Sequence, residues 1–184
     1  MRIFLTGLVL FLIAESSPQA EEWVLQDGNL TIAARYEGQP VPAVFHRFTV
    51  NFDDKPATRR LQVQVDVTSI DFDSGDINDA VVGEEWFDTG QYPRARFRSE
   101  RVESIGDGQF RAVGKLELKG IHRTVEVPFQ WLVKESRRHL RGELQVQRSD
   151  FRIGTGEWEN ATEIGQEVDI RFDVRLQRSQ DKSP

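Results

Sequence analysis

Residues 76–120 of the chain read DINDAVVGEEWFDTGQYPRARFRSERVESIGDGQFRAVGKLELKG, and this stretch decides the fold. It opens with acidic residues beside apolar residues at helical spacing, which predicts one short helix over residues 76–88. An aromatic cluster and a Tyr-Pro break lead into two segments in which apolar and polar residues alternate. The stretch holds no catalytic constellation. We interpret it as the lid and wall of a β-barrel.

The same period-two alternation dominates the rest of the chain. Eight segments show it, at residues 30–36, 44–52, 61–67, 95–97, 110–118, 125–133, 140–146 and 168–176. Each has one apolar and one polar face, which is typical of antiparallel strands with one face in solvent. His46 lies in step with the apolar residues of the second segment. Turn residues such as Asp53-Asp54-Lys55-Pro56 and Gly106-Asp107-Gly108 separate the segments.

Strands with one apolar face need closure, because open sheet edges pair with other chains. Eight strands that close on themselves enclose room for side chains or for one small ligand. We therefore predict an all-β fold, an antiparallel eight-stranded barrel with one short helix in a long loop. A two-sheet sandwich is the alternative, since periodicity alone does not separate the two.

The amino terminus predicts export. Residues 1–20 form a signal peptide, with Arg2 before a twelve-residue apolar run, Ile3 to Ala14, that is too short to span a membrane. The mature domain is then residues 21–184. The chain contains no cysteine, so disulfides and thiolate metal sites are excluded. A net charge of −6 argues against nucleic acid as a partner.

Catalytic and metal sites find no support in the sequence. The histidines His46, His122 and His139 lie far apart, and no pair has metal-ligand spacing. Seven carboxylates crowd residues 71–88, but their spacing matches no calcium loop and favours a solvated helix face. No nucleophile elbow, phosphate loop or dinucleotide fingerprint is present. We predict a protein that is not an enzyme, with no catalytic residue, no metal and no covalently bound cofactor.

The aromatic residues suggest either a filled barrel or an apolar tunnel. The chain has twelve Phe, four Trp and two Tyr, and many of them fall on the inward rows. Pattern alone favours core filling, because a packed interior is the default.

At these residues the chain resembles the YceI-like family of polyisoprenoid-binding periplasmic proteins. The resemblance covers residues 23–176 and rests on the order and spacing of several short motifs. They are Trp86-Phe87-Asp88, Tyr92-Pro93-x-Ala95-x-Phe97-x-Ser99, Gly114-x-Leu116-x-Leu118-x-Gly120, Val125-x-Val127-Pro128-Phe129, Arg148-x-Asp150-Phe151-x-Ile153-Gly154 and Gly165-x-x-Val168. The Gly156-Glu157-Trp158 segment is similar to a subgroup found near membrane cytochromes of the b561 type.

The resemblance implies a lipocalin-like barrel in the periplasm, whose long apolar channel holds a long-chain isoprenoid lipid, the tail of a polyprenyl phosphate or a quinone, as a non-covalent ligand. It thereby favours the tunnel over the filled core. The residues expected to bind the ligand are Phe48, Phe52, Val65, Trp86, Phe97, Phe110, Leu116, Leu118, Val127, Phe129, Trp131 and Phe172.

Polar residues near a barrel mouth are candidates for the head group, namely Arg94, Arg96, Arg148, Asp150 and His46. For the Arg148 motif we favour a structural role, as an ion pair or loop cap that closes the last hairpin. The expected partners are an isoprenoid lipid, a transient contact with the inner membrane or a membrane cytochrome, and a second copy of the chain in a homodimer. The alternative function is an accessory protein that docks to a b561-type cytochrome or another quinone-dependent redox partner.

Overall fold

A computed structural model describes residues 22–134, 137–159 and 162–179. The predicted signal peptide lies outside the described residues. The strands are β1 (Glu22–Tyr36), β2 (Gln39–Phe45), β3 (Phe48–Asp53), β4 (Arg60–Asp66), β5 (Ile70–Asp71), β6 (Arg94–Gly106), β7 (Gln109–Leu118), β8 (Ile121–Lys134), β9 (Arg137–Gln147) and β10 (Glu167–Arg178). The helical elements are η1 (Val67–Ser69), α1 (Gly75–Val81), η2 (Arg148–Phe151) and η3 (Gly156–Trp158).

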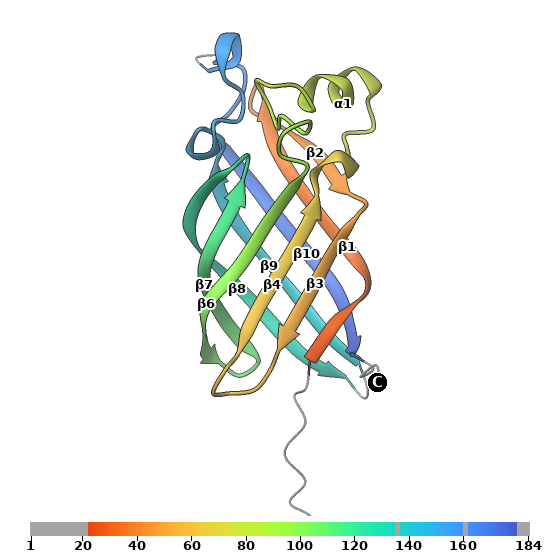
Figure 1. Ribbon diagram of the computed structural model, residues 1–184, viewed down its shortest axis with the longest axis vertical. Coiled ribbons are helices and arrows are strands. Elements are labelled where there is room, and N and C mark those ends of the chain that lie inside the picture. Colours follow the sequence, from red (N-terminus) through yellow and green to blue (C-terminus); the bar gives the residue numbers. More distant parts are fainter. Residues whose placement is uncertain (1–21, 135–136, 160–161, 180–184) are drawn as a thin grey trace, which may run out of the picture.

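The strands form a closed antiparallel barrel with eight strand positions, because β2 and β3 share one position and the two-residue β5 adds none (Figure 1). The hydrogen-bonded order runs β10-β9-β8-β7-β6-β4-β3-β1-β2-β5, and β10 pairs with β1 to complete the circle. The alternating apolar rows face the interior, because closure leaves only one face of each strand in solvent. This confirms the predicted barrel and excludes the sandwich.

The strand position shared by β2 and β3 is interrupted between the two strands. The two strands flank His46 and Arg47, with β2 pairing with the end of β1 and β3 with its beginning. The break shifts the inward row, so Ala43 is buried and Val44 is 36% exposed. The prediction that Val44 and His46 share the inward row is therefore wrong. His46 lies exposed on the rim instead.

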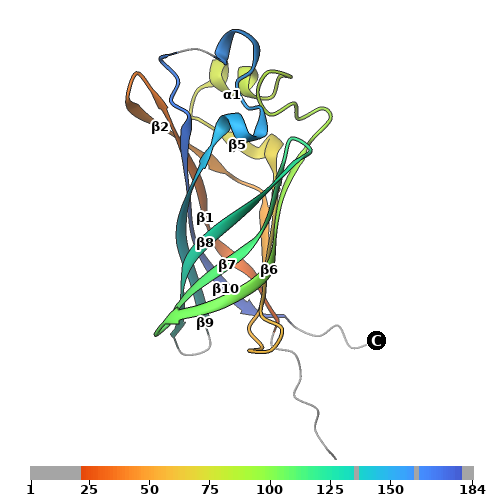
Figure 2. The ribbon, with the colours of Figure 1, turned by 90° about the vertical axis from the view of Figure 1, so that its left-hand side faces the viewer.

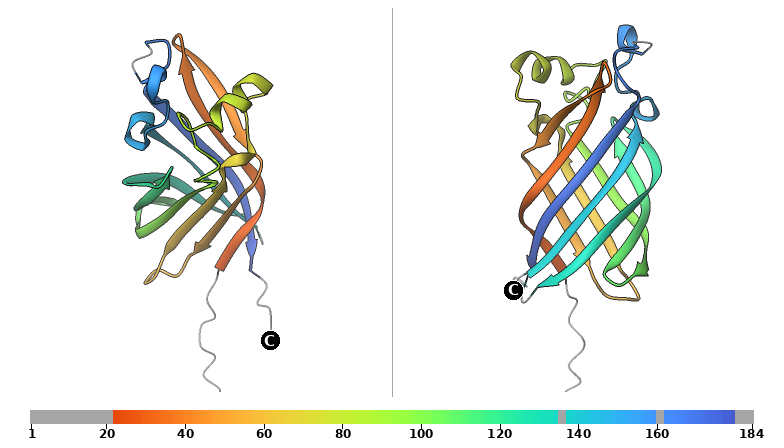
Figure 3. Two further views of the ribbon diagram at one scale, coloured as in Figure 1. Left: turned by 45° about the horizontal axis from the view of Figure 1, so that its top comes forward. Right: turned by 180° about the vertical axis from the view of Figure 1, so that it is seen from behind.

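The closing seam joins the two ends of the described chain. In β1 and β10, Trp23 pairs with Arg178 and Ala33 with Asp169. The amide of Ser179 also donates a hydrogen bond to the carbonyl of Glu22, at 2.8 Å. The two strands lie side by side over their length when the barrel is seen from behind (Figure 3).

The helical elements gather at one end of the barrel, which we call the mouth (Figures 1 and 2). Helix α1 is shorter than the predicted 76–88. It ends at Val81, and the amide of Gly83 donates a hydrogen bond to the carbonyl of Ala80 at 3.1 Å. The turns that follow bring Trp86 and Phe87 over the barrel, as the lid interpretation requires, but these two residues lie in a loop and not in the helix. We call α1 and these turns, residues 75–88, the lid.

The interior contains two apolar clusters. The first fills the end of the barrel away from the mouth, and we call its aromatic centre, Trp23, Phe52, Phe110, Phe129 and Trp131, the plug. The Phe52 and Trp131 ring centroids lie 4.6 Å apart, and those of Phe110 and Phe129 lie 5.6 Å apart. The second cluster lies under the lid and includes Val81, Phe87, Phe151 and Ile153.

Candidate functional site: an apolar cavity beneath the lid

A cavity of about 570 Å³ lies between the plug and the lid. Its wall consists almost entirely of apolar side chains, contributed by strands from all around the barrel. They include Leu30, Ile32, Val63, Val65, Phe97, Leu116, Leu118, Val125, Val127, Leu144, Val146, Val168, Ile170 and Phe172. Such a lining offers few hydrogen-bonding groups, so the cavity suits an apolar chain.

The floor of the cavity is the upper surface of the filled end. Leu61, Phe97, Val127 and Phe172 line the cavity and also pack in the first cluster. Phe172 is placed there because Gly142, beside it on β9, has no side chain. A Cβ atom added at Gly142 would lie 2.3 Å from the Phe172 ring.

The cavity opens beside the lid. Tyr36 at the end of β1 is 51% exposed and Ile77 of α1 is 37% exposed, yet both line the cavity. Residues that meet both solvent and cavity mark an opening, which we call the portal. Arg35 and Asp76 also line the cavity next to these two residues in the chain.

Arg148 holds the wall of the mouth together from inside. Its side chain is buried and donates hydrogen bonds to five backbone carbonyls, those of Ile153, Gly154, Trp158, Ile164 and Gly165, at 2.8–3.4 Å. No carboxylate is among these partners, and burial lowers the pKa of the guanidinium. The predicted loop cap is therefore confirmed, and the structure does not pair Arg148 with the exposed Asp150.

Further contacts fasten the lid loop to the segment that Arg148 caps. The Lys119 ammonium donates to the carbonyls of Glu84 and Arg152, at 2.6 and 2.9 Å. The amide of Gly154 donates to the carbonyl of Glu85 at 2.7 Å. The rings of Trp86 and Trp158 lie 5.7 Å apart. These contacts join the lid loop to residues 152–158.

Helix α1 is anchored through Asp71. The side-chain amide of Asn78 donates a hydrogen bond to Asp71 Oδ1 at 3.0 Å, and the backbone amide of Asp73 donates to the same atom at 2.9 Å. His46 Nε2 lies 3.2 Å from Asp71 Oδ2. The hydrogen bonds from Asn78, Asp73 and His46, in that order, hold the pKa of Asp71 down to about 2. This explains His46 as a rim residue that serves the lid.

The structure divides the predicted ligand-binding residues into two groups. Seven of them line the cavity: Val65, Trp86, Phe97, Leu116, Leu118, Val127 and Phe172. The other five lie in or against the plug and are absent from the cavity wall: Phe48, Phe52, Phe110, Phe129 and Trp131. The barrel is therefore filled with aromatic side chains at one end and hollow nearer the mouth, so the filled core and the apolar cavity lie at different heights.

The head-group candidates are not brought together at the portal. Arg94 and Asp150 are exposed, and Arg96 pairs with Glu117 at 3.4 Å. Sequence reasoning missed the portal residues Arg35, Tyr36, Asp76 and Ile77. The only sequence sign of them was the position of Tyr36 at the last inward step of its strand and of Ile77 in the lid helix.

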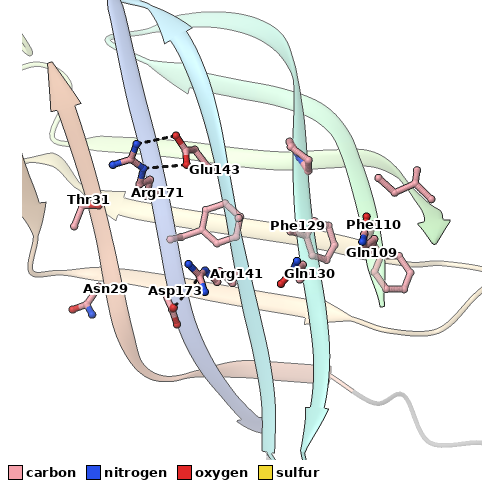
Figure 4. A pocket seen from close by; sticks show the side chains of 14 residues that line it. Asn29, Thr31, Gln109, Phe110, Phe129, Gln130, Arg141, Glu143, Arg171 and Asp173 are labelled. Carbon is pink, nitrogen blue, oxygen red and sulfur yellow. Dashed lines mark hydrogen bonds and ion pairs between the residues drawn. The ribbon is translucent and has the colours of Figure 1, made fainter. Parts of the chain in front are cut away.

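A second hollow, of about 720 Å³, lies at β7 to β10 and β1, and outward-facing side chains as well as Phe110, Phe129 and Phe172 of the filled end line it (Figure 4). Its charged residues face each other across strands. Arg171 pairs with Glu143 at 3.0 Å, and Arg141 lies 3.9 Å from Asp173. Since these charges neutralise each other, the hollow offers no unpaired charge to a ligand.

Within residues 22–134, 137–159 and 162–179, no group of three or more His, Cys, Asp or Glu side chains is placed to hold a metal ion. In the same ranges, no helix has the length and apolar character needed to cross a membrane.

The similarity to known proteins extends over the barrel just described. The family model described as the YceI-like domain matches residues 23–176, nearly the whole described barrel. The chain belongs to the YceI-like family. It is 26% identical to a UPF0312 protein of Vibrio parahaemolyticus over 137 residues, which is 69% of this chain and 72% of that protein. It is also 26% identical to Protein YceI of Escherichia coli over 133 residues, covering 68% of this chain and 67% of that one.

Solved structures of other proteins share the barrel. The crystal structure of Burkholderia cenocepacia BcnA matches with a TM-score of 0.77 and 30% identity, covering 80% of this chain and 95% of that one. A polyisoprenoid binding domain from Saccharophagus degradans, implicated in plant cell wall breakdown, matches with a TM-score of 0.63. Its identity is 13%, over 87% of this chain and 99% of that domain, so it shows the common fold alone.

Proposed function

We propose that this YceI-like protein is a non-catalytic carrier that holds a long-chain isoprenoid lipid, by the tail of a polyprenyl phosphate or a quinone, and that it works in the periplasm. The observation that carries the proposal is the apolar cavity, bounded by the plug at one end and open at the portal. The description of the Saccharophagus degradans domain as polyisoprenoid-binding supports the same ligand class.

Burial of the tail supplies the affinity. One isoprene unit contributes up to about 4 kcal/mol when it leaves water, at about 0.8 kcal/mol for each methylene-sized group. Ordering of the tail and loss of its free motion offset part of this gain. A few units are enough for tight binding without polar recognition, which fits a wall with almost no hydrogen-bonding groups.

The head group stays at the portal. An isoprenoid that enters tail first places its polar end near Arg35, Tyr36 and Asp76. Since Arg35 and Asp76 carry opposite charges, this rim accepts a phosphate or a neutral quinone ring. Docking to a membrane cytochrome stays a prediction, as does the homodimer.

The test is lipid extraction from protein purified without detergent, followed by mass spectrometry. A stoichiometric isoprenoid is expected from the parent protein. An empty extract, from a protein that also takes up no added isoprenoid, would refute the proposal.

A matched pair of variants on β8 links the ligand to the cavity. Val125 lines the cavity, whereas Thr124 faces outward and accepts a hydrogen bond from Lys115 at 2.6 Å. Val125→Asp places a carboxylate in the wall, and a bound tail would strip that carboxylate of water, which costs several kcal/mol. We expect Val125→Asp to lose the lipid and Thr124→Asp to retain it.

A further inference from the structure

The wall of the barrel is incompletely bonded between β8 and β9. Within the described residues, β8 forms ten residue pairs with β7 but only six with β9, beginning at Phe129. A Cβ atom added at Gly142 of β9 would lie 2.4 Å from the Pro128 carbonyl oxygen, so this carbonyl points toward β9. Pro128 has no N–H to donate on the same side, and the ladder ends there. Nearer the mouth, residues 121–128 therefore form a free strand edge, where β8 turns away from β9 (Figure 2).

Arg123 lies on this free edge. It pairs with Leu116 of β7, which lines the cavity, so the Cβ atom of Arg123 points to the inside of the barrel. Arg123 is nevertheless exposed and is absent from the cavity wall, and its guanidinium donates a hydrogen bond to the carbonyl of His122 at 3.1 Å. The charged end therefore leaves the interior over the edge of β8 that β9 does not cover.

The free edge borders an outer face that is rich in cations. We call this face the basic wall and define it as Arg94, Arg96 and Arg98 of β6, Lys115 of β7 and Arg123 of β8. Arg96 pairs with Glu117 at 3.4 Å. The other four are exposed, and no carboxylate of the described residues lies within 4.0 Å of their charged groups. Asp66, opposite Arg94 in the sheet, pairs with Arg47 instead, at 2.8 Å.

The arrangement of the basic wall is unfavourable for the fold itself. Arg98 and Lys115 occupy directly opposite positions in the β6–β7 ladder. Like charges at such positions destabilise a sheet. The Lys115 ammonium is bonded to the Thr124 hydroxyl at 2.6 Å rather than to a carboxylate. Since the fold gains nothing from these charges, we attribute them to a binding surface.

The opposite half of the barrel has a different charge distribution. In the strand order, β1 and β10 lie across the barrel from β6 and β7. There Arg35 lies 3.9 Å from Asp169, and Arg171 lies 3.0 Å from Glu143. The lid carries carboxylates and no Lys or Arg, and its helix α1 lies above β1 and β2 (Figure 1). Positive charge is therefore concentrated on the basic wall, although the whole chain has a net charge of −6.

We propose that the basic wall binds the surface of a membrane that contains anionic lipids. Charge complementarity indicates an anionic partner. The free edge of β8 also borders the apolar cavity, which Val125 and Val127 line. A lipid surface matches both features, because it presents anionic head groups above apolar chains. The choice of a lipid surface rests on the proposed function. A protein bound in this way turns its acidic lid and the portal away from the anionic surface.

The test is cosedimentation with phosphatidylcholine vesicles, prepared with and without phosphatidylglycerol. Each Lys or Arg at an anionic surface strengthens binding by about fivefold at low salt. Arg98→Gln combined with Lys115→Gln should therefore weaken binding to the phosphatidylglycerol vesicles about 25-fold, and Arg123→Gln about fivefold. The double variant should keep the melting temperature of the parent protein, because it removes a like-charge pair and breaks no ion pair.

A matched double variant removes the same charge from the opposite half of the barrel. Arg171→Gln combined with Arg175→Gln should change binding by less than about twofold, since charges farther than about 10 Å from the membrane are screened at about 0.1 M salt. Raising the salt concentration should weaken the binding of the parent protein.

Binding to phosphatidylglycerol vesicles that falls in the basic-wall variants and not in the matched variant would establish the surface. Equal binding of the parent protein to both kinds of vesicle, or equal losses in the two double variants, would overturn it. Tighter binding to soluble polyglutamate than to the vesicles would also overturn it, in favour of an acidic protein as the partner. The carrier function is decided by the lipid extract and not by these assays, so each proposal can fail while the other stands.

Discussion

Replacement of Arg148 by methionine should loosen the mouth and lower the stability of the whole barrel. The side chain is 3% exposed and makes five hydrogen bonds to backbone carbonyls. At about 1.5 kcal/mol each, the low end for a charged donor, these five bonds together contribute about 7.5 kcal/mol. Removal of the buried guanidinium also removes its desolvation penalty of several kcal/mol. The expected net loss is about 3–4 kcal/mol.

The assay is thermal and denaturant unfolding of the lipid-free protein. A loss of this size lowers the melting temperature by about 10 °C in a domain of this length. The matched control is Arg152→Met, the same change at an exposed residue, which should shift stability by less than about 0.5 kcal/mol. If Arg148→Met unfolds within about 1 kcal/mol of the parent protein, the five bonds do not hold the mouth as argued.

Three further predictions concern the lid, the floor and the plug. The pKa of Asp71 is depressed from 3.8 to about 2, so the stabilisation of α1 by the Asp71 carboxylate is complete above pH 3.8 and is lost as pH falls through about 2. Acid titration of the tryptophan fluorescence should show this step, and Asp71→Asn should abolish it. Gly142→Ala should destabilise the barrel by about 1–3 kcal/mol in thermal unfolding, and Phe172→Ala should reduce that loss. Phe52→Ala should lower the free energy of unfolding by about 3–5 kcal/mol in urea. The control Leu132→Ala, at a residue that is 45% exposed, should lower it by less than about 0.5 kcal/mol.

The sequence predicts which face of a strand lies inside, but not how far along the barrel a residue lies. Val125 and Phe129 stand four residues apart in the same inward row, yet one lines the cavity and the other belongs to the plug. Period-two alternation assigns both to the interior with equal strength. Height depends on the stagger between strands, which is a property of the closed barrel. For this reason the filled core and the tunnel looked like alternatives.

Local chemistry decides the remaining differences. The two-residue break at His46 and Arg47 carries no glycine or proline, so the shift of the inward row there has no local sequence sign. The turn at Gly106-Asp107-Gly108, by contrast, was predicted, and Gly108 adopts a positive φ. The cap by Arg148 was predicted from its motif, whereas its five carbonyl partners are spread over residues 153–165 and are brought together only by the fold.

Under the proposed function, the seam between β1 and β10 would determine when the barrel can first hold a lipid. Pairing between strands at opposite ends of the described chain is the slowest kind to form, because a long loop must close first. Until β10 docks, the cavity lacks one side of its wall and has no affinity for a tail. A bound lipid therefore leaves the rate of folding unchanged and slows unfolding instead. The loaded protein gains a longer lifetime rather than a quicker assembly.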